Sequence, residues 1–457
     1  MNIVGLSAFY HESACCLLQE GRLVAAAAEE RFTRIKHDPR LPVRAFRYCL
    51  EAGGLSIADV DCIAYYESPV EKLARQLWAG PPRGDGELAW LDPGRPLRAI
   101  GERLGYDGPV AIFRHHESHA ASAFFYSGFE EAAILTVDGV GEWATTTYGH
   151  GRAGAPPTLE LLEEVHFPHS LGLLYATITA YLGFRVNSGE YKVMGLAAHG
   201  RPRYVAEVER LLEDGPGGQF RLDMRYFDFL QGQAMYAPAL CALFGRPPRR
   251  PDEPLEPFHR DVACSVQAVL EAMLLRKVRY LAARVPSANL CMAGGVALNC
   301  VANGRLLREG PFARLFVQPA AGDAGGCLGA AALAHTRLAG GRPPLPALRH
   351  VYLGPAPAPG EIAALVAATG LPALDFRGRE GALLEAVADR LAAGKVVGWF
   401  QGRMEFGPRA LGARSILASP LEPEMQERLN AMVKKRERFR PFAPSVLLAH
   451  AAEHFAL

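Results

Sequence analysis

The stretch NIVGLSAFYHESACCLLQEGRLVAAAA, at residues 2–28, decides the fold. Its three apolar runs are separated by a polar turn at residues 9–13 and by a second turn at Gly21. Short apolar runs bounded by turn residues predict three strands joined as a meander. Residues 132–148 repeat this plan, because the run AAILTVDG is followed by a turn at residues 140–142 and then by WATTTY. Two copies of one pattern, far apart in the chain, indicate a duplicated fold.

The actin, Hsp70 and sugar-kinase ATPases are built on such a duplicated α/β plan, and their hairpin turns grip phosphate. Hairpins are common, so the repeat alone is weak support for this fold. A buried strand, a glycine-containing loop and a helix are expected at residues 289–299 and again at residues 314–334. We therefore predict an α/β domain at residues 1–335, with two lobes at about residues 1–160 and 161–335.

The remainder of the chain predicts a second, smaller domain. Residues 336–352 are rich in Pro, Gly and Arg, which is typical of a linker. Residues 353–457 are expected to form a smaller α/β domain that contains a strand at residues 396–400. At 457 residues and 49.4 kDa, the chain is too long for a single compact core.

Bulk composition excludes several classes of function. The net charge of +1 provides no overall field toward nucleic acid or a membrane surface. The 9 cysteines are scattered without CxxC spacing, which indicates reduced thiols rather than a disulfide framework or a zinc ribbon. No basic segment precedes the first strand, and no uncharged apolar run approaches the roughly 20 residues of a membrane span. We expect a cytoplasmic protein without membrane or nucleic-acid partners.

The segment RHHESHA, at residues 114–120, follows an apolar strand and opens a helix. His115 and His119 are four residues apart, so their side chains share one helix face and can hold one metal ion. A zincin motif fails here, because the fifth position counted from His116 is Ala120 rather than histidine. The alternative interpretation is a polar helix start whose histidines cap the helix or meet solvent.

Two aspartates strengthen the metal interpretation. Asp138 ends a predicted strand immediately before Gly139, and Asp323 lies in the glycine-rich segment AGDAGG after another strand. Each aspartate taken alone is explained equally well as a turn residue or a helix N-cap. Together with the two histidines they form a donor set that suits Fe²⁺, Mn²⁺ or Zn²⁺ better than Mg²⁺.

Glycines and asparagines near these strands are candidates for nucleotide binding. Gly294 and Gly295 permit close backbone approach, and the helix that follows favours an anion at its N-terminus. Asn299 and Asn303 are four apart on that helix and could bond a ribose or a base, although ordinary helix polarity explains them as well. The duplicated plan adds the two glycines of the second hairpin turn to this set: Gly139 and Gly141.

Two basic clusters lie in the predicted C-terminal domain. The segment GRMEFGPRALGARS, at residues 402–415, places arginines among glycine, proline and apolar residues, unlike a solvated charged helix. Residues 434–440 add five cations and one carboxylate, a local charge of +4. Arginine binds phosphate through two parallel hydrogen bonds. The clusters fit a nucleoside triphosphate or carbamoyl phosphate pocket, while a basic surface face or an RNA patch remains the competing explanation.

Taken together, these segments resemble the O-carbamoyltransferases of antibiotic and nodulation-factor biosynthesis. The resemblance covers nearly the whole chain, and the combination of motifs is far more specific than any one of them. The matching segments are GLSAFYHESACCLL, EERFTRIKHD, HHESHAASAFF, VDGVGEWATT, NSGEYKVMGLAAHG, MAGGVALNC, PAAGDAGGCLGAA, GRMEFGPRALGARSI and KKRERFRPFAPSV.

The resemblance implies two catalytic parts. The large domain is similar to the tRNA threonylcarbamoyladenosine transferase, an actin-like ATPase relative with a metal on His, His and Asp ligands. The small domain is similar to threonylcarbamoyl-AMP synthase. The small domain would use ATP, as its Mg²⁺ complex, and carbamoyl phosphate to form carbamoyl-adenylate. The large domain would then transfer the carbamoyl group to a hydroxyl of a natural-product or sugar acceptor.

The resemblance also implies residue roles. His115, His119, Asp138 and Asp323 would hold the metal, expected to be iron, with zinc or manganese as alternatives. His11 and Lys36 would lie beside the acceptor and the carbamoyl group. The remaining cations would handle phosphates: Arg403, Arg409, Arg414, Lys435 and Arg440.

One departure concerns the C-terminal domain. The family continues past the position where this sequence stops, so we expect the small domain to be truncated, or completed by a second polypeptide or by another copy of the chain. Three other functions stay open at this point. They are a tRNA threonylcarbamoyl transferase-like enzyme, a catalytically incomplete actin-like nucleotide-binding protein and, despite the failed motif, a metallopeptidase.

Overall fold

The computed structural model describes residues 1–80, 91–230, 234–340 and 346–455. The chain divides into two compact units. The first consists of residues 1–355 together with Arg403–Arg409, and the second of residues 356–402 and 410–457. The predicted linker at residues 336–352 lies in the first unit, and its residues 341–345 are outside the described part.

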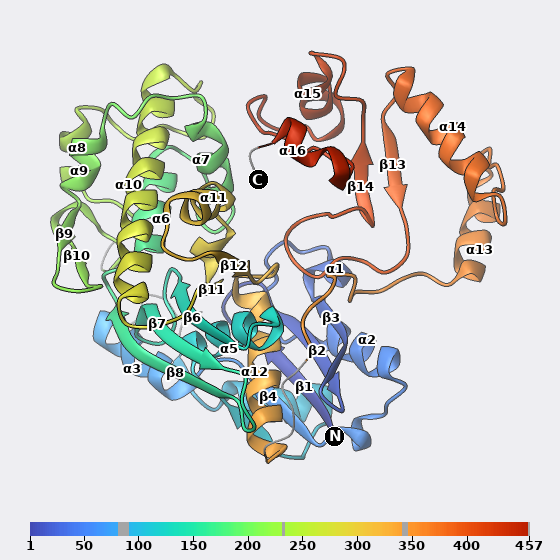
Figure 1. The fold of residues 1–457 in the computed structure, drawn as a ribbon, viewed down its shortest axis with the longest axis horizontal. Coiled ribbons are helices and arrows are strands. Elements are labelled where there is room, and N and C mark those ends of the chain that lie inside the picture. Colours follow the sequence, from blue (N-terminus) through green and yellow to red (C-terminus); the bar gives the residue numbers. More distant parts are fainter. Residues whose placement is uncertain (81–90, 231–233, 341–345, 456–457) are drawn as a thin grey trace. The chain divides into compact units, whose positions relative to one another are not determined.

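The first unit begins with a five-stranded mixed sheet of order β3-β2-β1-β4-β5. Its strands are β1 (Asn2–Ser7), β2 (Ala14–Gln19), β3 (Arg22–Ala28), β4 (Cys62–Tyr65) and β5 (Val110–Ile112). The first three strands are antiparallel neighbours, whereas β4 runs parallel to β1, and β5 runs parallel to β4. The meander predicted over residues 2–28 is therefore present (Figure 1).

A second five-stranded sheet has the order β12-β11-β6-β7-β8. Its strands are β6 (Glu131–Val137), β7 (Ala144–Arg152), β8 (Thr158–His166), β11 (Asn289–Ala293) and β12 (Arg314–Val317). Counted along the chain, both sheets follow the same order, 3-2-1-4-5, with three antiparallel strands and then two parallel ones. This identity of topology confirms the duplicated, actin-like α/β fold.

Two helices occupy equivalent positions in the duplicated halves. Helix α5 (His115–Ser127) follows the fifth strand of the first sheet, and helix α12 (Asp323–Leu338) follows the fifth strand of the second. The two helices pack against each other, and α12 also packs on β1. A side chain at Gly329 would place a Cβ 1.7 Å from the backbone oxygen of Ser118, so the close approach of the helices requires glycine there.

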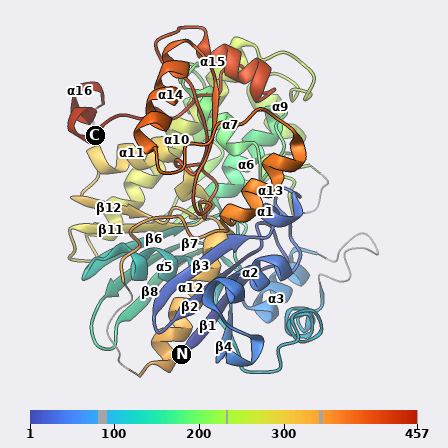
Figure 2. The same ribbon diagram turned by 90° about the vertical axis from the view of Figure 1, so that its right-hand side faces the viewer.

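The other elements of the first unit surround this centre. Strand β2 directs Cys16 toward α12 and Leu17 toward α2, so these helices cover opposite faces of the first sheet, as Figure 2 shows. The long α10 packs on α6, α7, α8 and α11. The remaining elements are α1 (Glu30–Thr33), α2 (Val43–Gly53), α3 (Pro69–Ala79), α4 (Arg95–Ala99), α6 (Leu171–Tyr181), α7 (Glu190–Ala197), α8 (Val205–Glu209), β9 (Leu212–Asp214), β10 (Phe220–Leu222), α9 (Pro238–Phe244), α10 (Pro257–Ala282) and α11 (Cys300–Glu309).

The second unit contains an antiparallel pair of strands with helices before and after it. Strand β13 (Val397–Phe400) pairs with β14 (Arg414–Leu417), and β13 coincides with the strand predicted at residues 396–400. The helices are α13 (Pro359–Thr369), α14 (Glu380–Ala392), α15 (Met425–Arg428) and α16 (Ala451–His454). Among the helices of the described residues, none combines the length and the apolar character needed to cross a bilayer.

Candidate metal centre

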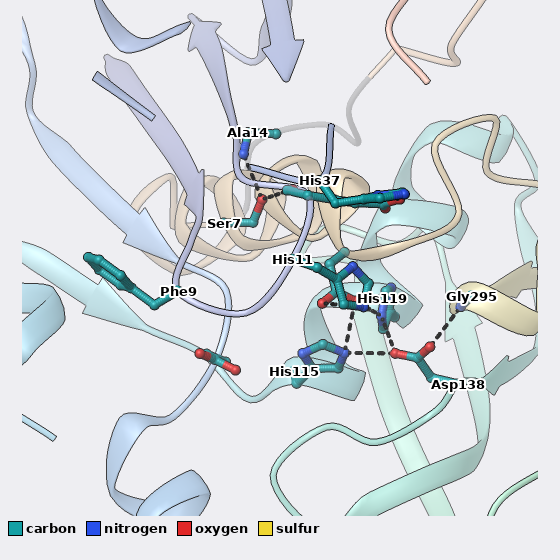
Figure 3. Close-up of polar contacts among 12 residues, drawn as sticks. Ser7, Phe9, His11, Ala14, His37, His115, His119, Asp138 and Gly295 are labelled. Atoms are coloured by element: carbon teal, nitrogen blue, oxygen red, sulfur yellow. Dashed lines mark hydrogen bonds and ion pairs between the residues drawn. The ribbon is translucent and has the colours of Figure 1, made fainter. Parts of the chain in front are cut away.

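Four buried side chains converge in the first unit: His115, His119, Asp138 and Asp323. One donor atom from each residue lies within 4.8 Å of the donor atoms of the other three. The Nε2 atoms of His115 and His119 are 3.0 Å and 3.2 Å from Oδ2 of Asp138, and both are 3.6 Å from Oδ1 of Asp323. Figure 3 shows the two imidazoles directed toward the carboxylate of Asp138.

The duplicated fold explains why these four residues meet. His115 is the first residue of α5 and Asp323 is the first residue of α12, so equivalent helix starts in the two halves each contribute a ligand. His119 lies one turn further along α5, on the same face as His115. Asp138 directly follows β6, the central strand of the second sheet. The four ligands therefore come from both halves of the first unit.

The electrostatics of the centre favour a bound cation. Both carboxylate oxygens of Asp323 are buried without a hydrogen-bond partner among the residues that the structure describes. Burying an ionised carboxylate is costly unless it is paired or coordinates a metal. Asp138 accepts a hydrogen bond from the Gly295 N–H at 2.9 Å through its other oxygen. Two carboxylates and two imidazoles so close together are a donor set for a divalent transition metal, and the residues present fit such an ion.

The titration behaviour of the centre points the same way. Burial alone would raise the pKa of Asp138, but hydrogen bonds from His115 and His119 hold that pKa well below its usual range. Burial opposes a charge on His119, yet Asp138 and Asp323 raise the pKa of His119 to about 9. The carboxylates thus favour a positive charge between them, and a divalent cation can supply it in place of the proton.

Of the two residues expected beside the acceptor, one lies at the centre. His11 is in the loop after β1, and its Nε2 atom is 3.8 Å from Oδ2 of Asp323. Its ring is a quarter exposed, so solvent or a ligand can reach it. Lys36 is exposed, and its ammonium group is 3.4 Å from the hydroxyl of Tyr191. The described contacts of Lys36 do not include the four ligands.

The predicted glycines shape the backbone around Asp138. Gly294 has φ +93°, and a Cβ there would lie 2.3 Å from the backbone oxygen of Val137. Gly141 packs against the rings of His115 and His116, while the space around Gly139 is open. Glycine at positions 294 and 141 therefore permits close approach to the end of β6 and to the two histidine rings, whereas position 139 imposes no such requirement.

The predicted asparagines make internal contacts. Asn299 exchanges hydrogen bonds with Gln267 at 2.9 Å and 3.0 Å, and it caps α11 through the N–H of Ala302. Asn303 donates to the backbone oxygen of Ala297 at 2.7 Å. Asn299 therefore links α10 to the start of α11, and Asn303 holds α11 to the short segment that precedes it.

The five cations expected to handle phosphates fall in two different units. Arg403 and Arg409 belong to the first unit and Arg414, Lys435 and Arg440 to the second. The guanidinium of Arg403 donates to the backbone oxygens of Val24, Leu353 and Gly354 and to the hydroxyl of Tyr48.

Three of the other four phosphate candidates have contacts within their own unit. Arg409 lies over the ring of Tyr191 at 5.8 Å. Arg414 stacks on Phe400 at 3.6 Å and donates to the carbonyls of residues 401 and 402. Arg440 lies 3.8 Å from the carboxylate of Glu437, and Lys435 has φ +45°.

Sequence analysis missed a buried carboxylate that supports the centre. Glu142 accepts hydrogen bonds from the backbone N–H of His115 at 2.9 Å and from that of Ser68 at 2.6 Å. It therefore caps the first turn of α5 and fixes the start of α3. Its position in the turn VGEW offered a signal, because a carboxylate within a glycine-containing turn can reach the free N–H groups of a neighbouring helix.

The fold and the centre together define a duplicated actin-like protein with a buried site of two histidines and two aspartates. Its sequence matches the family model of the carbamoyltransferase N-terminus at residues 2–79 and 102–332, and that of the carbamoyltransferase C-terminus at residues 388–457. The chain belongs to the carbamoyltransferase family, a family of transferases.

Relatives and solved structures give the extent of this similarity. An uncharacterized protein of Synechocystis sp. is 47% identical over 100% of this chain and 77% of its own length. The nodulation protein NolNO of Sinorhizobium fredii is 39% identical over 98% of this chain and 64% of its own length. Component A of the (R)-2-hydroxyglutaryl-CoA dehydratase of Acidaminococcus fermentans overlaps 72% of this chain and 96% of its own, at a TM-score of 0.36 and 13% identity.

Proposed function

We propose that this chain transfers a carbamoyl group from carbamoyl-adenylate to a hydroxyl of a small-molecule acceptor. The carbamoyl-adenylate would form by hydrolysis of carbamoyl phosphate to carbamate and inorganic phosphate, after which a carbamate oxygen displaces pyrophosphate from the α-phosphate of Mg²⁺-bound ATP. Membership of the carbamoyltransferase family supports a carbamoyl group as the group that is transferred. The observation that carries the proposal is the buried cluster of His115, His119, Asp138 and Asp323 at the meeting point of the two halves.

In the transfer step, the oxygen of the acceptor hydroxyl attacks the carbamoyl carbon. The bond from that carbon to the phosphate oxygen breaks, and AMP leaves. His11 is the proposed base for the hydroxyl proton, because its ring is partly exposed and lies beside Asp323. Proton removal by a positioned histidine contributes typically about 10²–10⁴-fold to a rate.

The residues of the centre have distinct duties in this proposal. Asp138 and Asp323 would hold the cation together with Nε2 of His115 and His119, and iron is the proposed ion. When bound, the ion would stabilise the negative charge that develops on the departing phosphate. Gly295 fixes the orientation of Asp138 through its backbone N–H, as Figure 3 shows.

The acceptor is proposed only as a class: a sugar, an aminoglycoside, a macrolide or a related hydroxylated natural product. The cations of the second unit, Arg414, Lys435 and Arg440, are proposed to contact phosphate groups during adenylation. Burial of the metal centre supports the transfer step, because shielding carbamoyl-adenylate from water limits its hydrolysis.

The test is carbamoyl transfer measured with radiolabelled carbamoyl phosphate. The purified chain, loaded with Fe²⁺, is incubated with ATP, Mg²⁺ and a panel of hydroxylated acceptors. We expect label in an acceptor and release of AMP, both dependent on ATP and both lost in Asp323→Asn. A parallel reaction that starts from synthetic carbamoyl-adenylate tests transfer separately from adenylation. Absence of carbamoyl-adenylate and of labelled product from the first reaction, together with absence of carbamoylated acceptor from the second, would overturn the proposal.

A further inference from the structure

Two adjacent tyrosines at the end of β4 differ in the hydrogen bonding of their hydroxyl groups. Tyr65 and Tyr66 are both 1% exposed. The hydroxyl of Tyr65 donates to the backbone oxygen of Ala8 at 3.0 Å and lies 3.4 Å from the carboxylate of Glu67. The hydroxyl of Tyr66 is buried and has no hydrogen-bond partner among the residues that the structure describes. A buried hydroxyl without a partner costs free energy, so its retention indicates a partner that the described residues do not supply.

Tyr66 lies directly beside the metal centre. Its ring centroid is 5.3 Å from that of His115, with the two rings tilted by 54°. On its other side the ring meets the first turn of α12, where a Cβ at position 326 would lie 2.6 Å from Cδ2 of Tyr66. Gly326 therefore leaves the space that the ring occupies. The tyrosine is held between the two helix starts that carry His115 and Asp323.

The surroundings indicate what kind of atom the hydroxyl meets. Burial raises the pKa of the Tyr66 hydroxyl, and the charges of Glu67 and Asp323 and the phenols of Tyr65 and Tyr10 raise it further. A phenol is protonated at neutral pH and can donate one hydrogen bond. A ligand held by the four-residue centre would present oxygen atoms to it, and a phosphate or carbonyl oxygen is an acceptor for that donor.

We propose that Tyr66 is a binding residue whose hydroxyl donates a hydrogen bond to an oxygen of the phosphate-linked carbamoyl substrate at the metal centre. This inference rests on the proposed carbamoyl transfer from carbamoyl-adenylate. It assigns to the substrate the hydrogen-bond partner that the described residues do not supply to this buried side chain.

The experiment compares Tyr66→Phe with Tyr65→Phe, since each removes one buried oxygen atom from neighbouring residues. AMP is the probe, titrated calorimetrically into the Fe²⁺-loaded full chain. We expect Tyr66→Phe to keep its iron content and its melting temperature, while its Kd for AMP and its KM for carbamoyl-adenylate rise about tenfold, the size of one hydrogen bond to a charged group. Tyr65→Phe should melt at a lower temperature and bind AMP as the wild type does.

Three outcomes would overturn the inference. Equal AMP binding and equal KM in Tyr66→Phe and wild type would mean that only water meets this hydroxyl. A lower melting temperature for Tyr66→Phe, with unchanged AMP binding, would mean that it has a partner inside the protein. If the wild type neither binds AMP nor carbamoylates any acceptor, the proposed function fails together with the inference, which separates that case from the first two.

Discussion

Asp323 places a negative charge where neither of its oxygens meets a hydrogen-bond donor within the described part of the chain. Its neighbours are Nε2 of His115, His119 and His11, at 3.6 to 3.8 Å, which is too long for hydrogen bonds. Such distances suit atoms that bind a common metal ion rather than atoms that are hydrogen-bonded to each other. This mismatch between the burial of Asp323 and its lack of direct hydrogen bonds favours a bound metal ion.

Removal of one imidazole tests that argument. His119→Ala should weaken binding of Fe²⁺ or Zn²⁺ by about 100-fold or more, because loss of a ligand should cost at least as much as loss of a group that only orients a ligand. Metal content after dialysis against a buffered chelator, measured by mass spectrometry, gives the answer. His166→Ala is the control, since His166 is exposed and pairs with Glu164 instead. Equal metal content in His119→Ala and wild type would disprove the assignment.

Lys277 is a buried lysine that lies outside the candidate metal centre. It is buried on α10, where its ammonium donates to the hydroxyl of Tyr148 at 3.1 Å and to the backbone oxygen of Gly218 at 3.0 Å. Burial lowers its pKa from 10.5 to about 7, against the opposing effect of Glu163. Between these two values the unfolded chain holds a proton that the folded chain has released, so this group makes the protein more stable as pH rises.

The size of this effect follows from the two pKa values. From pH 7 to pH 9 the free energy of unfolding should gain about 2 kcal/mol from Lys277 alone. Lys277→Met should lose that gain, and an exposed control, Lys395→Met, should keep it. Urea unfolding of the three proteins at pH 7 and pH 9 measures the difference. Parallel pH dependences for Lys277→Met and wild type would contradict the lowered pKa.

At the scale of elements, the meeting of α5 and α12 sets the geometry of the centre. Gly329 has no Cβ, and this lets the backbones of the two helices touch at Ser118. Gly329→Ala would force the helices apart, and overpacking of this kind costs typically about 1–3 kcal/mol. We expect a lower melting temperature and weaker metal binding, since His119 and Asp323 lie on these two helices.

Gly381 supplies the matched control for that substitution. It lies on α14, and apart from its chain neighbours and the backbone of its own helix, no atom of the described residues is within 4 Å of the position that its Cβ would take. Gly381→Ala should therefore be neutral or stabilising by up to about 1 kcal/mol, because alanine favours the helix. Thermal unfolding of both variants separates packing from propensity. Comparable destabilisation by the two substitutions would show that the contact at Ser118 is not the cause.

The elements that sequence analysis predicted well are those with a strong local pattern. The meander at residues 2–28 and its repeat at 132–148 are visible as apolar runs, and their duplication predicted the two matching sheets. The spacing of His115 and His119 predicted a shared helix face, and the helix is present. Tyr66 could not be found this way, because its role depends on rings brought close only by the tertiary fold. The turn around Glu142 offered a weaker signal, since only the tertiary fold determines which N–H groups its carboxylate reaches.

At the scale of the whole molecule, the chain returns to its first unit after leaving it. Residues 403–409 are part of the first unit although residues on both sides belong to the second. A domain boundary placed by composition at one linker does not reveal such a return, because no local pattern marks it. Sequence analysis therefore grouped Arg403 with the phosphate-binding cations of the smaller domain. The structure shows its guanidinium bonded to residues of the first unit.

These contacts can be used to test whether Arg403 anchors residues 403–409 or binds phosphate. If the guanidinium anchors the returning segment, Arg403→Lys should lower the free energy of unfolding by about 1–3 kcal/mol, because the single ammonium of lysine cannot reach Val24, Leu353 and Tyr48 together. If it binds phosphate, the same substitution should raise KM for ATP or carbamoyl phosphate and leave stability unchanged. Arg414→Lys, within the second unit, is the comparison for the phosphate role. We expect the loss of stability, measured by urea unfolding alongside the carbamoyl transfer assay. A raised KM at wild-type stability would instead mean that Arg403 binds phosphate. The two roles exclude each other, because the guanidinium N–H groups that bond to Val24, Leu353 and Tyr48 cannot bond to a phosphate at the same time.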